Sequence, residues 1–266
     1  MKVTVFTSNQ PRHIAFIERL ASICEEVYVV QECHSAFPGK EEGFYKKSEI
    51  MKEYFSYVLQ AEAKVFGEIR FSPPNVRSIA LKAGEVSLVD LTHLKDALHS
   101  DYYVVFGASF IKGELCDWLV SQKAINIHMG ISPYYRGNSC NFWAMYDGRP
   151  DLVGATIHLL GKGLDSGEML FHALPGRSLD YDPFILGMEA VKSAQCALID
   201  SIQSGTVHKI SPVIQNAQKE IKYTRNKDFT DAVAADYLSN LPSPAWVKKK
   251  IEQRDLSMFT NPVIQS

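Results

Sequence analysis

Short apolar runs alternate with longer amphipathic stretches through the first half of the chain. The runs at residues 2–7, 27–31 and 102–107 are rich in β-branched and aromatic side chains, as strands usually are. The stretches at 12–24 and 111–121 instead place apolar residues every three or four positions, which is the spacing of a helix with one buried face. This alternation predicts an α/β fold with a doubly wound, mostly parallel sheet.

The remaining periodic segments extend the same pattern. We expect further helices at residues 44–66, 90–99, 138–147 and 182–203, and a further strand at 77–81. Two extended runs at 154–160 and 168–174 are separated by a glycine-rich turn, which predicts an antiparallel pair. The sheet is therefore expected to be mixed. We interpret the aromatic stripe of the helix at 44–66 as part of the core.

The pattern also divides the chain into two parts. Residues 1–205 contain all the expected elements and should form one large domain. Residues 206–266 carry three prolines between positions 242 and 262 and lack a clear continuation of the strand and helix alternation. We interpret them as a small C-terminal region that packs on the large domain or mediates dimerisation.

Composition narrows the class of protein. The chain has 266 residues, with 28 lysines and arginines against 30 aspartates and glutamates, and this balance disfavours a nucleic acid partner. No segment approaches the roughly 20 apolar residues of a membrane-spanning helix, so we expect a cytoplasmic protein that does not bind membranes. Five cysteines are an odd number without a C-x-x-C pair, which indicates reduced thiols and no metal site.

Two polar residues break the apolar pattern at the end of one expected strand. Side chains alternate along a strand, so Asn126 and His128 share one face while Ile125 and Ile127 take the other. A buried strand of an α/β protein is normally apolar on both faces. Ligands of such folds bind at the carboxyl ends of strands. The position therefore favours a functional role for Asn126 and His128.

Asp165, in the glycine-rich turn that follows, completes a set of groups suited to acyl transfer to an amine. Attack of an amine on an amide-like carbonyl creates a negative oxygen and a positive nitrogen, so the site needs an oxyanion donor and a proton acceptor. Asn126 can donate through its amide, and His128 can relay a proton or, when charged, hold the oxyanion. Asp165 can fix the imidazole tautomer directly or through water. We expect a structural or orienting role for His158.

Five ordered motifs around these residues resemble the 10-formyltetrahydrofolate-dependent formyltransferases. They are the Asn126-Ile127-His128 strand, the Ser132-Pro133-Tyr134-Tyr135-Arg136-Gly137 loop, the Trp143-Ala144-Met145 helix, the Gly154-Ala155-Thr156-Ile157-His158 strand and the Asp165-Ser166-Gly167 turn. Their order and spacing agree with the family over roughly residues 100–170. The chain departs from the family at Gly130-Ile131-Ser132, where the loop usually contains Ser-Leu-Leu, but the three catalytic positions remain intact.

The resemblance implies formyl transfer from 10-formyltetrahydrofolate, as co-substrate, to a primary amine, without a metal. Asn126, His128 and Asp165 would be the catalytic group. The pterin of the folate would lie where backbone groups can read its ring, near Phe106, Gly107, Ala108, Leu160, Gly163 and Leu164. Related enzymes often form dimers through their C-terminal part, so the resemblance also implies a homodimer.

The amine acceptor follows from finer features. Formyltransferases of initiator methionyl-tRNA carry a larger C-terminal barrel and a basic surface, which this chain lacks. The inserted helix and short tail resemble the sugar-nucleotide N-formyltransferases, which formylate a deoxyamino sugar for surface polysaccharides such as the lipopolysaccharide O-antigen. Residues 8–13 are similar to enzymes that act on GDP-perosamine. The alternatives are glycinamide ribonucleotide as acceptor, hydrolysis of formyl-folate, and a non-catalytic folate or nucleotide binder.

Two loops are candidates for acceptor binding. Ser8, Asn9 and Arg12 lie where the first strand gives way to a helix, and exposed amides with the helix dipole could hold a pyrophosphate there. The alternative is that Ser8 or Asn9 only caps this helix. In the second loop, residues 134–136 supply Tyr134, Tyr135 and Arg136, which either line the acceptor site or order the loop by packing.

Overall fold

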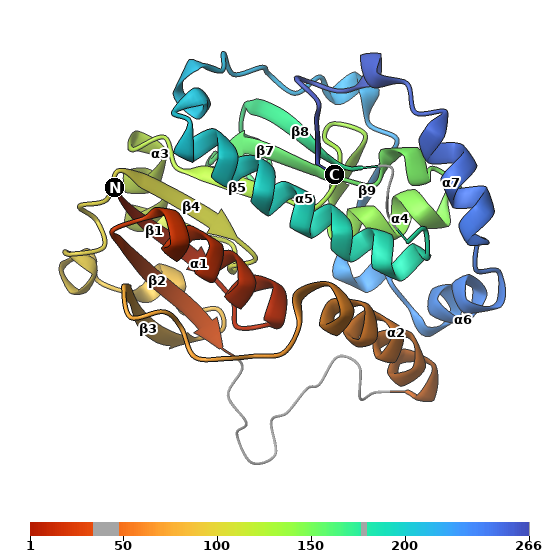
Figure 1. The fold of residues 1–266 in the computed structure, drawn as a ribbon, viewed down its shortest axis with the longest axis horizontal. Coiled ribbons are helices and arrows are strands. Elements are labelled where there is room, and N and C mark those ends of the chain that lie inside the picture. Colours follow the sequence, from red (N-terminus) through yellow and green to blue (C-terminus); the bar gives the residue numbers. More distant parts are fainter. Residues whose placement is uncertain (34–47, 177–179, 266) are drawn as a thin grey trace.

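One mixed sheet of eight strands dominates the computed structural model, which describes residues 1–33, 48–176 and 180–265. The strands are β1 (Lys2–Thr7), β2 (Glu26–Cys33), β3 (Val76–Lys82), β4 (Tyr102–Phe106), β5 (Ile125–His128), β7 (Ala155–Leu159), β8 (Met169–Pro175) and β10 (Val263–Gln265), in the spatial order β10-β8-β7-β5-β4-β1-β2-β3 (Figure 1). The β5–β7 and β7–β8 pairs are antiparallel and the other pairs of this sheet are parallel. The predicted mixed, mostly parallel sheet is confirmed.

Seven α-helices and several shorter elements complete the described part of the chain. The α-helices are α1 (Pro11–Ile23), α2 (Glu49–Phe66), α3 (Gly113–Ser121), α4 (Cys140–Tyr146), α5 (Pro183–Gln203), α6 (Asp231–Ser239) and α7 (Pro244–Glu252). A second, two-stranded sheet pairs β6 (Tyr135–Gly137) with β9 (Lys222–Thr224) in parallel. Short 3₁₀ helices lie at Val86–Leu88, Leu91–Leu94, Pro150–Leu152, Thr206–Lys209, Ala217–Lys219, Asn226–Asp228 and Leu256–Met258.

Local sequence explains where the two longest helices begin. Ser48 caps α2, because its side chain accepts a hydrogen bond from the backbone of Met51. The first four residues of the helix predicted at 44–66 lie outside the described residues. Asp182 caps α5 by accepting from the backbone N–H groups of Phe184 and Ile185, and a proline occupies the first helical position.

The helix predicted at residues 90–99 is wrong. The structure has two 3₁₀ helices, Val86–Leu88 and Leu91–Leu94, followed by turns. The side chain of Asp90 accepts from the backbone N–H and the hydroxyl of Thr92, which closes a tight turn at this point. Apolar residues three positions apart fit a 3₁₀ turn as well as an α-helix, so spacing over ten residues could not distinguish them.

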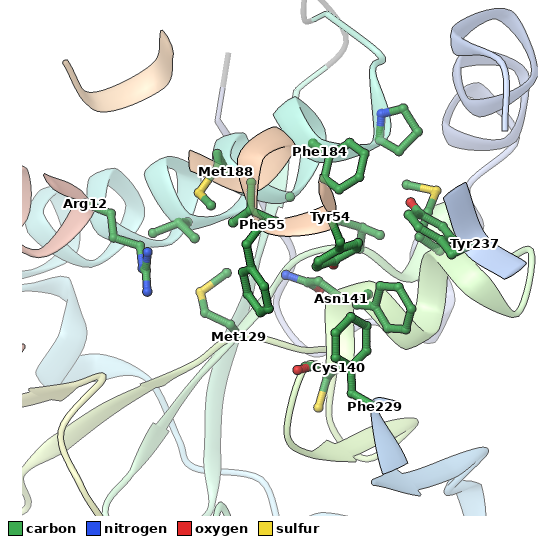
Figure 2. A pocket seen from close by; sticks show the side chains of 18 of the residues that line it. Arg12, Tyr54, Phe55, Met129, Cys140, Asn141, Phe184, Met188, Phe229 and Tyr237 are labelled. Atoms are coloured by element: carbon green, nitrogen blue, oxygen red, sulfur yellow. The ribbon is translucent and has the colours of Figure 1, made fainter. Parts of the chain in front are cut away.

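The C-terminal part packs against the main sheet and forms a second hydrophobic cluster with α2, α4 and α5. Aromatic rings from these elements gather around one cavity (Figure 2). Val247 and Ile251 of α7 are buried in the same cluster, and β10 adds a parallel strand to the edge of the sheet at β8. Residues beyond 206 therefore share both the sheet and the core of the preceding part.

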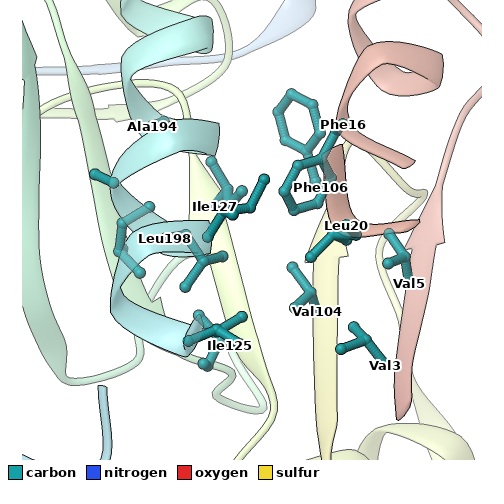
Figure 3. Close-up of a cluster of buried hydrophobic side chains, with 14 of the residues drawn as sticks. Val3, Val5, Phe16, Leu20, Val104, Phe106, Ile125, Ile127, Ala194 and Leu198 are labelled. Atoms are coloured by element: carbon teal, nitrogen blue, oxygen red, sulfur yellow. The ribbon is translucent and has the colours of Figure 1, made fainter. Parts of the chain in front are cut away.

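Side chains alternate along the central strands and contribute to two hydrophobic cores, one on each face of the sheet. Val3 and Val5 of β1 and Val104 of β4 face α1 and α5 (Figure 3). Phe6 and Val105 point the other way and pack with α3 and the turns at residues 86–98. This two-sided burial is typical of a parallel sheet covered by helices on both faces.

The five cysteines are free, as expected from their number and spacing. Among the described residues, no helix has both the length and the apolar character needed to cross a membrane.

Candidate active site

The carboxyl end of β5 presents two polar side chains on one face, as the alternation predicts. Ile125 and Ile127 are buried in the core beneath α5 (Figure 3). Asn126 and His128 point to the other face of the sheet. The neighbouring strand β7 pairs antiparallel with β5 and places His158 directly across from Asn126. Strand geometry thus delivers an amide and two imidazoles to one small region of the sheet.

Asp165 reaches this region from the connection between β7 and β8. Its Oδ2 lies 3.2 Å from Nδ1 of His128, and its Oδ1 lies 3.4 Å from Nδ2 of Asn126. Asp165 has a φ of +45°, a left-handed conformation that few non-glycine residues adopt. The structure therefore brings together Asn126, His128 and Asp165, the three residues predicted to form the catalytic group.

Burial and charge act against each other at the His128–Asp165 pair. Burial lowers the pKa of His128, but its interactions with Cys140 and Asp165 outweigh burial and leave the pKa well above its ordinary value. Burial likewise raises the pKa of Asp165, but the charge of His128 and the hydrogen bond from its Nδ1 outweigh burial and bring the pKa well below its ordinary value. Both shifts favour an imidazolium paired with a carboxylate.

The amide of Asn126 is oriented by His158. Nδ1 of His158 lies 2.7 Å from the carbonyl of Leu159 and must donate to it, so in the neutral ring Nε2 accepts from Nδ2 of Asn126 at 2.9 Å. The second N–H of Asn126 makes the longer 3.4 Å contact with Asp165. His158 is 1% exposed. This geometry agrees with the orienting role expected for His158.

A thiol faces the other side of the His128 ring. Sγ of Cys140, at the start of α4, lies 3.6 Å from Nε2 of His128 and donates to the carbonyl of Gly137 at 3.4 Å. Gly130 is packed against both partners, since a β-carbon there would lie 2.4 Å from Cβ of Cys140 and 2.9 Å from Nε2 of His128. The two nitrogens of His128 thus face Asp165 and Cys140 respectively.

A small hollow of about 90 Å³ opens beside Asn126 and Asp165. It is lined by four of the six residues predicted to bind folate, which are Ala108, Leu160, Gly163 and Leu164. Phe110 and Leu164 are about half exposed and offer apolar surface for a flat ring. The remaining two, Phe106 and Gly107, do not line this hollow. Phe106 is buried in the core and stacks on His13, and Gly107 also lies against the His13 ring.

A larger cavity of about 350 Å³ lies on the Cys140 side. Figure 2 shows aromatic rings around it: Tyr54 from α2, Phe184 from α5, Tyr237 from α6, and Phe229 from the turn before α6. Met129, the residue after His128, also lines it. The aromatic stripe interpreted as core is therefore both core and cavity wall, because Tyr54 is buried and still borders the cavity.

Arg12 lies at the opposite end of this cavity from Tyr237 (Figure 2). Its Nη1 donates at 2.7 Å to Oε1 of Glu62, and its backbone N–H donates to the same oxygen at 3.2 Å. Glu62 comes from α2 and has 2% of its side chain exposed, whereas Arg12 has 27% exposed. The buried carboxylate fixes Arg12 at the cavity, where it is the only charged lining residue in the described part.

The neighbouring Ser8 and Asn9 do not cap α1. The residue before the helix is Gln10, whose side chain makes no capping bond, so the capping alternative is wrong. Ser8 is buried, and its backbone N–H donates to Nδ1 of His13 at 3.0 Å. Ser8 therefore has no free backbone donor for a ligand, while Asn9 is exposed.

The loop residues Tyr134, Tyr135 and Arg136 do not line either cavity. The hydroxyl of Tyr134 donates to the carbonyl of Met258, and the hydroxyl of Tyr135 donates to Asp147 at 3.2 Å. Arg136 pairs with Glu220 at 3.1 Å. Both tyrosines are buried. These contacts fit the alternative that the three residues order the loop by packing, while acceptor binding by them stays a prediction.

No group of three or more metal-ligating side chains occurs in the described ranges. Sequence reasoning missed Cys140, Glu62 and Gln215, which contact His128, Arg12 and the Asp165 turn. Each is separated from its partner by at least 12 positions, and no local periodicity marks it. Only the fold itself brings these residues to the site.

The family model described as Formyl transferase matches residues 2–175. The chain therefore belongs to the formyl transferase family. A methionyl-tRNA formyltransferase of Finegoldia magna is 30% identical over 121 residues, which is 42% of this chain and 38% of that protein. The matched region thus spans well under half the length of that relative.

Solved structures of two kinds of formyltransferase share the fold. A sugar N-formyltransferase from a Shewanella species has a TM-score of 0.52 and 19% identity, and covers 86% of this chain and 78% of its own. Glycinamide ribonucleotide transformylase 1 from Symbiobacterium toebii has a TM-score of 0.50 and 14% identity, and covers 81% of this chain and 94% of its own. At these identities the likeness establishes the α/β formyltransferase fold and leaves the acceptor open.

Proposed function

We propose that this chain transfers the formyl group of 10-formyltetrahydrofolate to the primary amine of a nucleotide-linked deoxyamino sugar. The observation that carries the proposal is the position of His128 between two hollows. Its Nδ1 contacts Asp165, which lines the small hollow, and its Nε2 contacts Cys140, which lines the large cavity. A donor on one side and an amine acceptor on the other would meet at this ring.

The small hollow suits the folate. Its wall combines apolar side chains with the glycine-rich backbone of residues 160–165, which can approach a planar ring closely. Asn126 and Asp165 border the same hollow, so a formyl group held there would lie beside the catalytic set. When bound, the folate supplies the activated one-carbon group, and the protein supplies orientation and charge.

The residues divide the transfer chemistry among them. We assign oxyanion stabilisation to the N–H of Asn126 that now makes the long contact with Asp165, because that weaker bond is the easier one to exchange. His128, charged because its pKa is raised, can give a proton to the leaving nitrogen and take up the proton that the amine loses. Asp165 keeps the ring oriented and compensates its charge.

The large cavity suits the acceptor. Aromatic walls can pack against the faces of a sugar or a base, and Arg12 at one end can meet a phosphate. The exposed Asn9 lies two residues before the start of α1, in which Arg12 is the second residue. We retain GDP-perosamine as the first acceptor to test, with a role in O-antigen synthesis, because residues 8–13 are similar to enzymes of that type.

An acceptor screen tests the proposal. The purified protein is incubated with 10-formyltetrahydrofolate and, in separate reactions, with GDP-, dTDP- and UDP-linked amino sugars, glycinamide ribonucleotide, methionyl-tRNA or no amine. The proposal predicts a mass gain of one carbonyl unit on an amino sugar and release of tetrahydrofolate only when that sugar is present. Turnover without an amine would indicate a hydrolase, and turnover with only tRNA or glycinamide ribonucleotide would overturn the sugar assignment.

The proposal assigns catalysis to residues 1–205 and a supporting role to residues 206–266, including a homodimer contact. Trp246, Leu241 and Ile264 of this part are more than a third exposed, which is compatible with a contact between subunits. Sedimentation velocity of the full chain over a range of concentrations tests the dimer. A single species of monomer mass at all concentrations would exclude it.

A further inference from the structure

One side chain from the C-terminal part holds the turn that carries Asp165. Nε2 of Gln215 donates to the backbone carbonyl of Asp165 at 2.8 Å and to that of Gly167 at 2.8 Å. Both hydrogens of this amide are therefore used on the two carbonyls that flank Ser166. Gln215 lies 50 residues beyond Asp165 in the sequence, so the clamp depends on the tertiary fold.

The turn needs such support. Asp165 adopts a φ of +45°, which costs a non-glycine residue on the order of 1 kcal/mol. Lys162, Gly163, Leu164 and Ser166 of the same connection are exposed, so few buried contacts fix it. Side-chain direction follows from the backbone at Asp165, and the carboxylate must remain within reach of His128. An unclamped turn would lose that alignment.

Gln215 is itself anchored close to the turn. Val213, two residues earlier, forms an antiparallel bridge with Met169 at the start of β8, with 2.8 Å N–H···O distances in both directions. Met169 follows the Asp165 turn by only four residues. The bridge therefore places the Gln215 side chain over the turn at low conformational cost, because the backbone two residues before it is already fixed.

We propose that Gln215 is a positioning residue that fixes the Asp165 carboxylate against His128 and thereby sets the protonation of the catalytic imidazole. The expected effect of Gln215 on formyl transfer rests on the proposed function. The expected effect on His128 does not depend on the proposed function, because the two hydrogen bonds of Gln215 to the Asp165 turn involve no ligand. The C-terminal part thus contributes to the reaction through Gln215 without touching the reacting atoms.

The test replaces Gln215 by methionine, which keeps the length of the side chain and removes both donors without adding charge. The matched control is Gln218→Met, three residues further along, where the side chain is exposed. His128 is titrated by NMR of its ring Cε1–H signal, and circular dichroism checks the fold. In Gln215→Met we expect the titration midpoint of His128 to fall by about one pH unit, because the carboxylate moves away. In Gln218→Met we expect no change.

Kinetics add a second readout once an acceptor is found. We expect Gln215→Met to lower kcat by a factor on the order of 10 to 100 with little change in KM for the acceptor, since the misplacement affects a catalytic group and not the acceptor cavity. A Gln215→Ala variant serves if Gln215→Met does not fold. An unchanged His128 midpoint in a folded variant overturns the positioning role. Failure of every acceptor would overturn only the proposed function, because the NMR titration needs none.

Discussion

The imidazole of His13 fills the space that a side chain at residue 107 would occupy. A β-carbon on Gly107 would lie 2.3 Å from Cε1 of His13. His13 also stacks on Phe106 with 4.7 Å between ring centroids. From β1 the chain adds β2 and β3 on one side and then crosses to add β4 on the other side, so β1 and β4 are parallel neighbours at a topological switch point. Folds of this type often bind ligands in the crevice at such a point. Here His13 packs against residues 7 and 8 at the end of β1 and against Phe106 at the end of β4, and the candidate site lies at β5.

The close approach of His13 to Gly107 predicts that alanine at residue 107 lowers the free energy of unfolding more than alanine at other glycines of similar φ. Gly107 and Gly113 both have a φ of +68°, but nothing lies within 4 Å of a β-carbon on Gly113. Both alanine variants pay for the left-handed backbone, and only Gly107→Ala also displaces His13. We expect Gly107→Ala to lose on the order of 1–3 kcal/mol more than Gly113→Ala in urea unfolding. Equal losses would show that His13 moves aside freely.

Much of the fold follows from local patterns. The runs of β-branched residues predict the strands β1, β2 and β4, because these strands are buried on both faces and carry few polar residues. The shortest strands were not predicted. Strands β6, β9 and β10 have three residues each, too short for any periodicity, and they exist because another segment offers a pairing edge.

The site residues also fall into those that local sequence marks and those that only tertiary packing brings to the site. Asn126 and His128 stand out because a single buried strand carries both, and the glycine-rich turn marks Asp165. Cys140 and Gln215 could not be predicted, because their contacts depend on how α4 and the C-terminal segment pack. For Tyr134 and Tyr135 the sequence left two roles open, because an aromatic loop residue has the same local signature whether it binds a ligand or fills the core, and the structure buries both side chains.

Asp165→Asn should separate catalysis from folding. The change removes the charge that pairs with His128, so we expect the pKa of His128 to fall and formyl transfer to decrease on the order of 10²- to 10⁴-fold. Circular dichroism should remain that of the wild type. Asp96→Asn, an exposed carboxylate 3.4 Å from Arg77, is the matched control and should leave activity unchanged. Retention of most activity by Asp165→Asn would refute its catalytic assignment.

The same pair predicts a pH window for stability. The folded pKa of His128 is raised, so its contribution is present at pH values below its unfolded pKa and is lost as pH rises through the folded value. The folded pKa of Asp165 is lowered, so its contribution is present above its unfolded pKa and is lost as pH falls through the folded value. Urea midpoints of wild type and Asp165→Asn should therefore differ most between the two unfolded pKa values.

Arg12 and Glu62 should be strongly coupled. Arg12→Met leaves the buried carboxylate of Glu62 with the backbone N–H of residue 12 as its one hydrogen-bond donor among the described residues, and we expect a loss of about 3 kcal/mol in the free energy of unfolding. The double variant Arg12→Met with Glu62→Met removes the unpaired charge and should recover much of that loss. Lys52→Met breaks an exposed pair with Glu49 and should change little. Additive losses in the double variant would contradict the coupling.

His172 should contribute to acid destabilisation. It is buried on β8, its Nδ1 accepts from the backbone of Thr260 at 2.9 Å, and burial lowers its pKa to about 4. The folded state therefore keeps the ring neutral, and its contribution to stability is full above about pH 6.5 and falls as pH drops from there to about 4, by roughly 3 kcal/mol in total. His172→Gln can still accept from Thr260 but does not titrate, so its urea midpoint should decline less over this range. His99→Gln, at an exposed site, is the control, and parallel declines in wild type and His172→Gln would rule out the assignment.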